Sequence, residues 1–346
     1  MAQHRAGWRV AVACPDDGLL AATLRDSGVR VLPWVATREP GPRVIAELRA
    51  LKRLLDREQP DVVHLHSSKA GLAGRLALRG RRPTLFHPHA WSFSAATGAT
   101  GRAALQWERF ASRWTDVVLC CSESERALGI ASGVRAPAVT VGNGVDLDDF
   151  PSQSAAARAS ARAALRLGSG PLAVFVGRYC EQKGQDLLLD AWPAVRDALP
   201  GATLLMAGYG QQEDDVRRRA TSLQGIVLLG RQGDIRPLLA AADVFVMPSR
   251  YEGLSLTLLE AMASGRSVVA HDVVGMRDVL SGHGTLVPLG DTTALAKAII
   301  DQLRDPSAAD AIGQDARAHV ARDHSIEAWI ERVRSATEAA ATRPVR

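Results

Sequence analysis

The sequence contains little cysteine, few aromatic residues and almost no lysine. Its four cysteines are Cys14, the adjacent Cys120 and Cys121, and Cys180. They form no CxxC pair, and four cysteines among 346 residues are too few for a fold held together by disulfides. We therefore expect free, buried thiols.

Long apolar runs are also missing. No stretch approaches the roughly 18 to 20 residues needed to cross a membrane. The opening MAQHRAGWRV lacks the apolar core of a signal peptide. These absences predict a cytoplasmic protein, whose membrane contact, if any, would be peripheral and at the inner face.

No run of basic residues in the chain suggests an arm that binds nucleic acid. The net charge is +5, but the charge is scattered rather than gathered into an arm typical of nucleic-acid binding. We therefore exclude nucleic acid and favour anionic nucleotides or a membrane surface as partners. Only four of the 42 basic residues are lysines, and the others are arginines. This bias towards arginine favours a specific role for an ammonium group at the four lysines, which are Lys52, Lys69, Lys183 and Lys297.

Strand-like apolar runs alternate with helical patterns along the whole chain. They lie at 9–14, 29–34, 61–66, 84–89, 116–121 and 138–145, and again at 171–177, 202–208, 226–230, 244–247, 267–273 and 284–288. This alternation, with 47% hydrophobic residues, predicts an α/β protein with two Rossmann-like, doubly wound parallel sheets. We expect one domain at 1–165, a second at 166–325, and a C-terminal amphipathic helix and tail at 326–346 packed on the body.

The stretch 242–279 carries the clearest pattern of strand, loop and helix. Residues 244–247 form an apolar run typical of a buried strand, the loop 248–255 follows, and 256–263 has helical spacing. Open α/β sheets bind ligands at the carboxyl edge of their strands, where this loop would lie. The amides that open the helix suit a phosphate, and they belong to Gly253, Leu254 and Ser255.

Two carboxylates mark this stretch, Glu252 in the loop and Glu260 inside the helix. Glu260 would share a helix face with Leu256 and Ala263, where a carboxylate is costly unless something hydrogen-bonds it. A ligand diol is one such partner. The alternative is that Glu260 pairs with a structural arginine and Glu252 is merely solvated.

Two cations follow the strand at 171–177, in the turn GRYCEQKG. Arg178 sits where the strand ends and Lys183 just before the next helix, so both can face one crevice. A diphosphate is the anion that suits a fork donor together with a point charge. The alternative is a pair of exposed loop cations with no ligand.

Two patterns resemble metal sites. Asp146, Asp148 and Asp149 look like a DxD motif, but we interpret them as the turn after the sequence NGV. The second pattern is four histidines that alternate along two strands: His64, His66, His87 and His89.

Strand alternation pairs His64 with His66 and His87 with His89, and no cysteine or third ligand is evident for either pair. We therefore expect no zinc at these histidines.

Together these motifs resemble the group 1 glycosyltransferases (glycosyltransferase family 4), retaining enzymes of the GT-B fold. The resemblance rests on GRxxxxKG after a strand, then PSRYEGLSLTLLEAMASG, then VVGMRDV. Other segments are similar to successive parts of the family's acceptor domain: HSSKAGLAGRLAL (66–78), HPHAWSF (87–93), DVVLCCSESER (116–126) and NGVDLDDF (143–150). Almost the whole chain from about Arg9 is covered.

The resemblance implies two Rossmann-like domains facing a central cleft, the first for an acceptor and the second for a UDP- or GDP-sugar donor. Arg178 and Lys183 would hold the diphosphate and stabilise the leaving group. Glu260 would bind the ribose hydroxyls, and Glu252 the hydroxyls of the transferred sugar. The remaining donor contacts would come from Gly253, Leu254 and Ser255.

His89 matches the histidine of the family's HG motif beside the reacting centre, with Ala90 in place of the glycine. Trp91 and Phe93 would contact the acceptor, which we expect to be a saccharide, a lipid-linked sugar or a small hydrophobic molecule. A helical face of aromatics suits a membrane interface, although a core helix is the stronger interpretation; it comprises Trp107, Phe110 and Trp114.

The resemblance predicts retaining transfer of a sugar from a nucleotide-sugar, without a metal or other cofactor, in polysaccharide, glycolipid or glycoconjugate biosynthesis. A GT-B epimerase or phosphorylase is one alternative, and a catalytically inactive paralogue that binds nucleotide-sugar is another. In this family a first strand and a glycine-rich loop precede the segment that resembles 5–31. We therefore expect the first βα unit, and with it a central strand, to be missing here.

Overall fold

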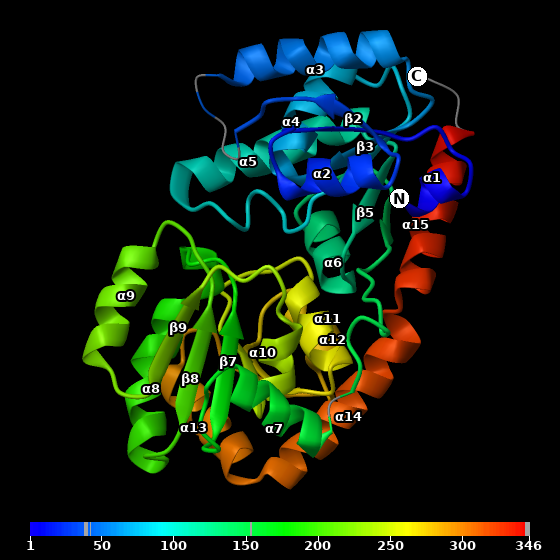
Figure 1. Cartoon of the computed structure of the whole chain (residues 1–346). Coiled ribbons are helices and arrows are strands. Elements are labelled where there is room, and N and C mark those ends of the chain that lie inside the picture. The colour runs from blue at the N-terminus through cyan, green and yellow to red at the C-terminus, as the bar shows by residue number, and fades with distance from the viewer. Residues whose placement is uncertain (38–40, 42, 153, 343–346) are drawn as a thin grey trace. The chain divides into compact units, whose positions relative to one another are not determined.

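The computed structural model describes residues 1–37, 41, 43–152 and 154–342 (Figure 1). The chain divides into two compact units. The first unit comprises Met1–Cys121, Glu125–Val141 and the chain from Ile330 onward, and the second comprises Ser122–Ser124 and Gly142–Trp329. In the part of the chain described, no helix is both long and apolar enough to cross a membrane.

The first unit contains two separate parallel sheets. β1 (Ala11–Cys14) pairs with β2 (Arg30–Pro33), and the second sheet has the order β3-β4-β5-β6. Its strands are β3 (Val63–His66), β4 (Thr84–His87), β5 (Val117–Cys120) and β6 (Ala138–Thr140). No pairing joins the two sheets among the residues described. The missing central strand stays a prediction.

The helices of the first unit alternate with these strands, as the sequence pattern predicts. They are α1 (Ala2–Arg5), α2 (Leu19–Asp26), α3 (Val44–Glu58), α4 (Ser67–Leu78), α5 (Gly98–Ala111), the 3-10 helix η1 (Ser112–Trp114), α6 (Glu123–Ala131) and α15 (Ile326–Ala341). Both faces of β4 and β5 are buried, which explains their uninterrupted apolar sequences.

Helix α15 lies within the segment 326–346 for which the sequence predicts an amphipathic helix and tail, and residues 343–346 of that tail lie outside the described residues. Ala340 is fully buried against Leu85 and Val117 of the first unit's sheet. The Thr337 hydroxyl lies 3.0 Å from Nε2 of His64, and Arg332 Nε donates to the Val141 carbonyl at 2.8 Å. The last turns of α15 therefore complete the core of the first unit.

The second unit is one six-stranded parallel sheet with the order β12-β11-β10-β7-β8-β9. The strands are β7 (Leu172–Val176), β8 (Thr203–Ala207), β9 (Ile226–Gly230), β10 (Val244–Met247), β11 (Ser267–His271) and β12 (Thr285–Val287). The remaining elements are α7 (Ala155–Ala164), η2 (Glu181–Lys183), α8 (Gln185–Ala198), α9 (Glu213–Ser222), α10 (Arg236–Ala241), α11 (Leu256–Ala263), α12 (Met276–Leu280), α13 (Thr292–Arg304) and α14 (Pro306–Asp323).

Helices α8 and α13 cover one face of this sheet (Figure 1). Trp192 of α8 and Ile299 of α13 are completely buried against alternate side chains of β7, β8 and β10. The intervening side chains Val174, Leu205 and Phe245 are buried too, so the sheet is covered on both faces. A doubly wound sheet of this kind buries long apolar strands.

The strand order reverses between β7 and β10. These strands are hydrogen-bonded neighbours, with Val244 opposite Ala173, although about 70 residues separate them in sequence. The loops that follow them therefore emerge side by side at the topological switch point. Ligands of open α/β sheets bind at this position.

The division between the units differs from the predicted boundary at residue 165. Helix α7 belongs to the second unit, because its arginines bind the acidic residue that precedes β10. Arg162 Nη2 lies 2.6 Å from Asp243, and Arg158 Nη1 lies 3.3 Å from the same carboxylate. Asp243 also accepts the Leu172 amide at 2.8 Å, so these ion pairs tie α7 to the start of β7. An Ala/Arg composition alone does not reveal this partner.

Candidate functional site

The loops after β7 and β10 meet at an ion pair. Lys183 Nζ lies 2.6 Å from Oε1 of Glu252, and both side chains are largely buried. The Ser249 hydroxyl donates to the same oxygen at 2.9 Å. The interpretation of Glu252 as a merely solvated carboxylate is therefore wrong. The structure brings together one predicted residue from each loop.

Gln182 connects this ion pair to Arg178. Its Oε1 accepts from Arg178 Nη2 at 3.2 Å, and its Nε2 donates to the Tyr251 carbonyl at 3.1 Å. Nε2 also lies 3.5 Å from Oε2 of Glu252. Sequence reasoning missed Gln182, although its place between the two cations was a usable signal. No carboxylate of the described residues pairs with Arg178, so its charge is available to an anion.

Two glycines allow the loops to approach. Gly184 has a φ of +63°, and a Cβ there would lie 1.9 Å from the Pro248 carbonyl oxygen. Gly275, in the sequence VVGMRDV, has a φ of +82°, and its Cβ would lie 2.1 Å from the Gly253 carbonyl oxygen. Neither position has room for a side chain. These contacts are the physical reason for two of the glycines in the motifs.

A second ion pair holds the loop after β10. Arg250 binds Asp186 of α8 through two hydrogen bonds of 2.8 and 2.6 Å. The guanidinium lowers the pKa of the Asp186 carboxyl. From the other side, Asn143 donates its side-chain amide to the Leu254 carbonyl at 2.8 Å. This bond gives the NGV segment a role in positioning the predicted donor loop, which the sequence did not reveal.

The start of α11 offers unsatisfied amide groups. Its N-cap residue is Ser255, whose side chain makes no capping hydrogen bond. Gly253, Leu254 and Ser255 are all buried or nearly so, and their amides donate to no group of the described chain. A helix N-terminus of this kind carries partial positive charge and suits an anion.

Glu260 lies one turn further along α11. It is half-buried, and burial raises the pKa of its carboxyl. Among the described residues, neither an arginine nor any other donor binds that carboxylate, and burial is the sole cause of its shifted pKa, so the alternative of a structural arginine is wrong. A desolvated carboxylate without a partner is costly, which points to a hydrogen-bonding ligand.

The loop after β4 holds His89 in an uncommon conformation. His89 and Ala90 have φ values of +51° and +84°, in the left-handed region that favours glycine. Glu125, which sequence reasoning missed, fixes this loop: its Oε1 accepts the Ala90 amide at 2.7 Å, and its Oε2 accepts the Cys121 amide at 2.6 Å. Burial raises the pKa of Glu125.

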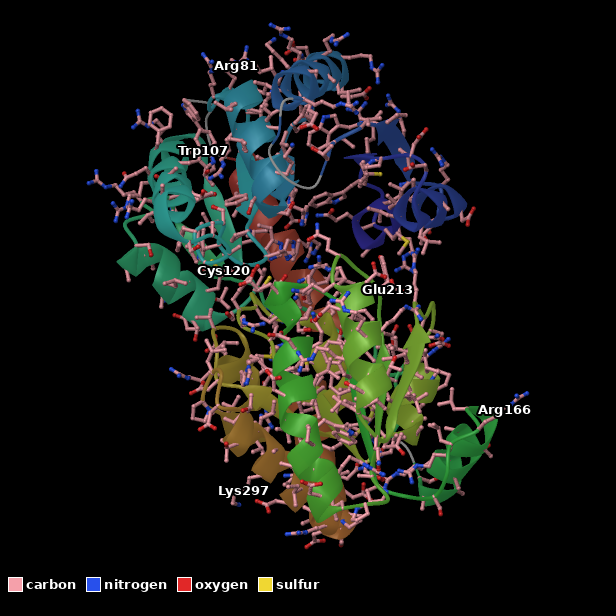
Figure 2. The ribbon with its side chains drawn as sticks, turned by 90° about the vertical axis from the view of Figure 1, so that its left-hand side faces the viewer. Arg81, Trp107, Cys120, Arg166, Glu213 and Lys297 are labelled. Carbon is pink, nitrogen blue, oxygen red and sulfur yellow. The ribbon has the colours of Figure 1, made fainter. Side chains whose placement is uncertain are left out.

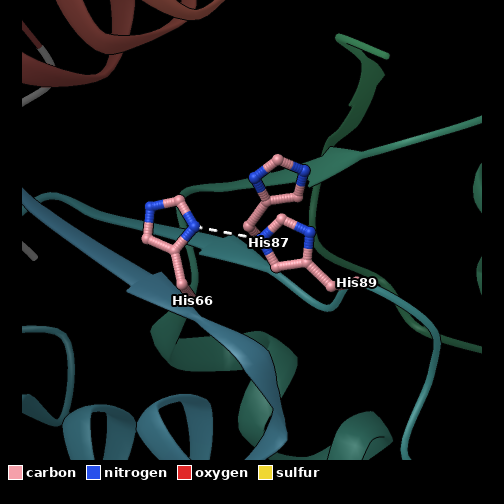
Figure 3. A group of neighbouring side chains, drawn as sticks. All are labelled: His66, His87 and His89. Carbon is pink, nitrogen blue, oxygen red and sulfur yellow. Dashed lines mark hydrogen bonds between the residues drawn. The ribbon is translucent and has the colours of Figure 1, made fainter. Parts of the chain in front are cut away.

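Three histidines gather at this loop (Figure 3). His66, His87 and His89 each place one ring nitrogen within 4.8 Å of the others. His66 Nδ1 lies 3.1 Å from His89 Nε2, and the rings of His87 and His89 stack at 3.9 Å. Burial, together with the neighbouring imidazoles, lowers the pKa of His87 to about 2, so its ring is neutral. The sequence analysis predicts two separate pairs, His64 with His66 and His87 with His89. That prediction is wrong, because His66 lies with His87 and His89.

The register of the sheet explains this difference. β3 and β4 are parallel neighbours, and His66 lies directly opposite His87. A cysteine also contacts the group: Cys121 Sγ lies 3.3 Å from His87 Nε2 and 3.4 Å from His89 Nδ1.

The aspartates that follow the sequence NGV form a turn, as predicted. The Asp146 carboxylate accepts the Asp148 amide at 3.0 Å.

Trp91 does not lie where an acceptor could touch it. Only 2% of its surface is exposed, and its indole Nε1 donates to the Glu125 carbonyl at 2.8 Å. It packs edge-on against Phe86 and stacks on Phe93 at 5.5 Å. The prediction of a direct acceptor contact for Trp91 is therefore corrected to a structural role. Phe93 is partly exposed, and its acceptor contact stays a prediction.

The predicted aromatic face is present and extends from α5 into η1. Ring centroids of Trp107 and Phe110 lie 6.2 Å apart, and those of Phe110 and Trp114 lie 5.0 Å apart. Phe110 is 43% exposed, with Arg113 over its ring at 4.0 Å. Trp107, labelled in Figure 2, is only partly exposed, so the face combines core packing with an exposed edge.

Two family models match the chain. The model described as glycosyltransferase family 4 matches residues 1–149, and the model described as glycosyl transferases group 1 matches residues 170–305. The phosphatidyl-myo-inositol mannosyltransferase of Mycobacterium tuberculosis (strain H37Rv) is 33% identical over 292 residues, covering 80% of this chain and 73% of the relative. The protein belongs to the group 1 glycosyltransferases of family 4 and is a glycosyltransferase.

Two other proteins are similar to this chain over most of their own length. The UDP-Gal:alpha-D-GlcNAc-diphosphoundecaprenol alpha-1,3-galactosyltransferase of Escherichia coli is 26% identical over 337 residues, covering 93% of this chain and 86% of the relative. The crystal structure of Anabaena HepE in complex with UDP and glucose matches with a TM-score of 0.82 at 21% identity, covering 95% and 91% of the two chains. This likeness establishes the GT-B fold.

Proposed function

We propose that this glycosyltransferase uses a nucleotide-sugar donor and retains the configuration at the transferred carbon. The observation that carries the proposal is Glu260, a half-buried carboxylate without a hydrogen-bond donor among the residues described. It lies on the same helix whose N-terminal amides are unsatisfied. A ribose diol would satisfy the carboxylate, and a diphosphate would satisfy the amides.

The charges of the site support a diphosphate leaving group. Arg178 has no carboxylate partner among the residues described, and Lys183 forms an ion pair with Glu252. The guanidinium would meet the diphosphate directly, and the ammonium would share its charge between Glu252 and the phosphate. Negative charge grows on the diphosphate as the sugar departs, so both cations stabilise the transition state more than the ground state. Such chemistry needs no metal.

Glu252 has one oxygen occupied by Lys183 and Ser249. Its other oxygen, Oε2, has only the long contact to Gln182, and can accept a hydroxyl of the sugar. In the first unit, the role proposed for His89 at the reacting centre rests on the family resemblance. Its left-handed backbone supports the proposal, because strained conformations concentrate at functional sites.

The acceptor is proposed to be a saccharide or a lipid-linked sugar. The relatives from Escherichia coli and Mycobacterium tuberculosis are named for a diphosphoundecaprenol-linked sugar and a phosphatidyl-inositol as substrates. The exposed edge of the aromatic face, with Arg113 over Phe110, supports peripheral contact with an anionic membrane. A cytoplasmic location is proposed because the opening MAQHRAGWRV lacks the apolar core of a signal peptide.

Thermal unfolding with UDP-, GDP- and ADP-sugars tests the donor. A specific donor at 100 times its Kd stabilises the folded state by about 2.7 kcal/mol, which raises Tm. We expect one nucleotide class to do so, and Glu260→Gln to reduce the stabilisation by about half or more, because tenfold weaker binding leaves about 1.4 kcal/mol at the same donor concentration. Equal Tm values with every nucleotide-sugar would contradict the donor assignment.

Product analysis tests the reaction. Transfer yields a glycoside and a nucleoside diphosphate, whereas epimerisation yields a new free sugar or donor, and an inactive paralogue consumes nothing. NMR of the glycoside reads the anomeric configuration, and inversion would contradict retention. EDTA should leave the rate undiminished; loss of activity, with recovery on adding a divalent metal, would overturn the metal-free mechanism.

A further inference from the structure

The histidine group at the carboxyl edge of the first unit's sheet has the composition of a metal site. Its ligand candidates come from two neighbouring strands and the loop that follows: His66 ends β3, His87 ends β4, and His89 lies two residues later. Imidazole nitrogen is a preferred ligand of zinc, copper and nickel. Nothing in the donor chemistry proposed above uses His66 or His87.

The distances fit a single ion. Zinc–nitrogen bonds of about 2.0–2.1 Å at a tetrahedral angle place two nitrogens about 3.3 Å apart. His66 Nδ1 and His89 Nε2 are 3.1 Å apart, and one nitrogen of His87 lies within 4.8 Å of both other ligands. To reach this spacing the His87 ring must rotate out of its stack on His89. Figure 3 shows the rings of His66 and His89 facing each other, with His87 beside them.

Cys121 contacts the ring nitrogen of His89 that does not face His66. His89 turns Nε2 towards His66 and Nδ1 towards Cys121, whose Sγ is 3.4 Å away. A proton on Nδ1, directed at the sulfur, leaves the lone pair of Nε2 free for a metal. Metal-bound histidines characteristically use the second ring nitrogen in this way, which fixes the tautomer.

The group is open to solvent on one side. His66 and His89 are exposed, whereas His87 is buried. His64, the next histidine on β3, is turned away and bonded to Thr337 at 3.0 Å. An ion can therefore reach three ligands from water and keep a fourth position open, as in three-histidine zinc sites.

We propose that His66, His87 and His89 bind a divalent transition metal ion of the class that prefers neutral imidazole, with zinc as the representative. The ion is not a cofactor of transfer. Because it occupies Nε2 of His89, it removes that imidazole from the reacting centre and inhibits the enzyme. This inhibitory consequence rests on the role proposed above for His89, whereas binding of the ion does not.

Calorimetry on untagged, EDTA-stripped full-length protein tests the site. Zinc should bind with a stoichiometry of one, and cobalt(II) bound in its place should give the visible absorption of a four-coordinate ion. His66→Ala should weaken zinc binding by at least about tenfold, because loss of a hydrogen-bond partner behind a metal ligand already costs about 10- to 100-fold and His66 is itself a ligand. His64→Gln, on the same strand but outside the group, should bind zinc like the unaltered protein.

Failure of the unaltered protein to bind zinc at micromolar concentration would overturn the site. So would equal zinc affinity in His66→Ala, with far-ultraviolet circular dichroism confirming that the variant is folded. Either result leaves the proposed transferase reaction untouched, because that reaction is assayed without metal.

Transferase rates with added zinc test the consequence. The zinc concentration that halves the rate should match the calorimetric Kd, and it should rise at least about tenfold in His66→Ala relative to that variant's own metal-free rate. Zinc that binds without slowing transfer would overturn the inhibitory role and would place His89 away from the reacting centre.

Discussion

Lys183 and Glu252 form a 2.6 Å ion pair between two loops that follow neighbouring strands of the second unit's sheet. The pair distinguishes Lys183 from an exposed lysine such as Lys297 of α13 (Figure 2), which forms an ion pair with Asp301 one turn away on the same helix. The charge of Lys183 is therefore partly neutralised by Glu252. Arg178 has no carboxylate partner among the residues described.

The first prediction concerns these cations. Arg178→Ala and Lys183→Ala should each lower kcat/KM by an amount equivalent to about 3 kcal/mol, because each meets charge that develops in the transition state. Lys183→Ala also leaves Glu252 buried without its ion-pair partner, so it should lower Tm, which Arg178→Ala should not. Lys297→Ala is the matched control, with unchanged kinetics. An unaltered kcat/KM in both site variants would contradict the assignment.

The second prediction separates the two glutamates. Glu260→Ala should weaken nucleotide binding by about tenfold or more, the value of one to two hydrogen bonds to a charged group. Glu252→Ala should mainly lower kcat, because Glu252 is assigned to the transferred sugar. Calorimetry with the nucleoside diphosphate and steady-state rates measure the two effects. Negligible changes in both constants would refute the division of roles.

The third prediction concerns the pH dependence of stability. Burial raises the pKa of Glu260 above its ordinary value of 4.5, so this group destabilises the fold as pH rises through its folded-state pKa. The penalty is absent below the unfolded-state pKa. Glu260→Gln should therefore raise the free energy of unfolding at pH 7, and the gain should shrink as pH falls to 4. A gain that grows on acidification would show the opposite sign.

The fourth prediction uses two glycines with the same φ of +82°. Gly282 has open space at the position of a Cβ, whereas a Cβ on Gly275 would lie 2.1 Å from the Gly253 carbonyl oxygen. Gly282→Ala should cost only the backbone strain of about 1 kcal/mol. Gly275→Ala should cost about 2 kcal/mol more and should also impair donor binding, because it displaces the amides that open α11. Denaturant unfolding compares the two; equal losses would show that the contact does not hold this loop.

The fifth prediction concerns Ala90, which has a φ of +84° where the family has glycine. Ala90→Gly should raise the free energy of unfolding by about 0.5–1 kcal/mol, since relief of left-handed strain exceeds the added entropy of the unfolded chain. Ala103→Gly, on the exposed side of α5, should instead lower it by about 1 kcal/mol. If both variants are destabilised equally, the strain at Ala90 is not relieved by glycine.

The sequence by itself determined the α/β class, the alternation of strands and helices, and the position of the donor loops. It could do so because apolar periodicity defines each element, and parallel strands expose their carboxyl ends at one edge. Family motifs singled out Arg178, Lys183, Glu252 and Glu260, because their loops lie beside the topological switch point.

Only the tertiary structure decided which of these side chains meet and which are buried. Lys183 and Glu252 are 69 residues apart in sequence, and their ion pair depends on β7 and β10 being neighbours. Trp91 looks like an exposed aromatic in a loop, yet core packing buries it. Alternation along a strand assigns a side chain to a face of the sheet, but it does not say which strand is the neighbour or in what register the two strands pair. The sequence alone therefore could not predict that His66 lies opposite His87.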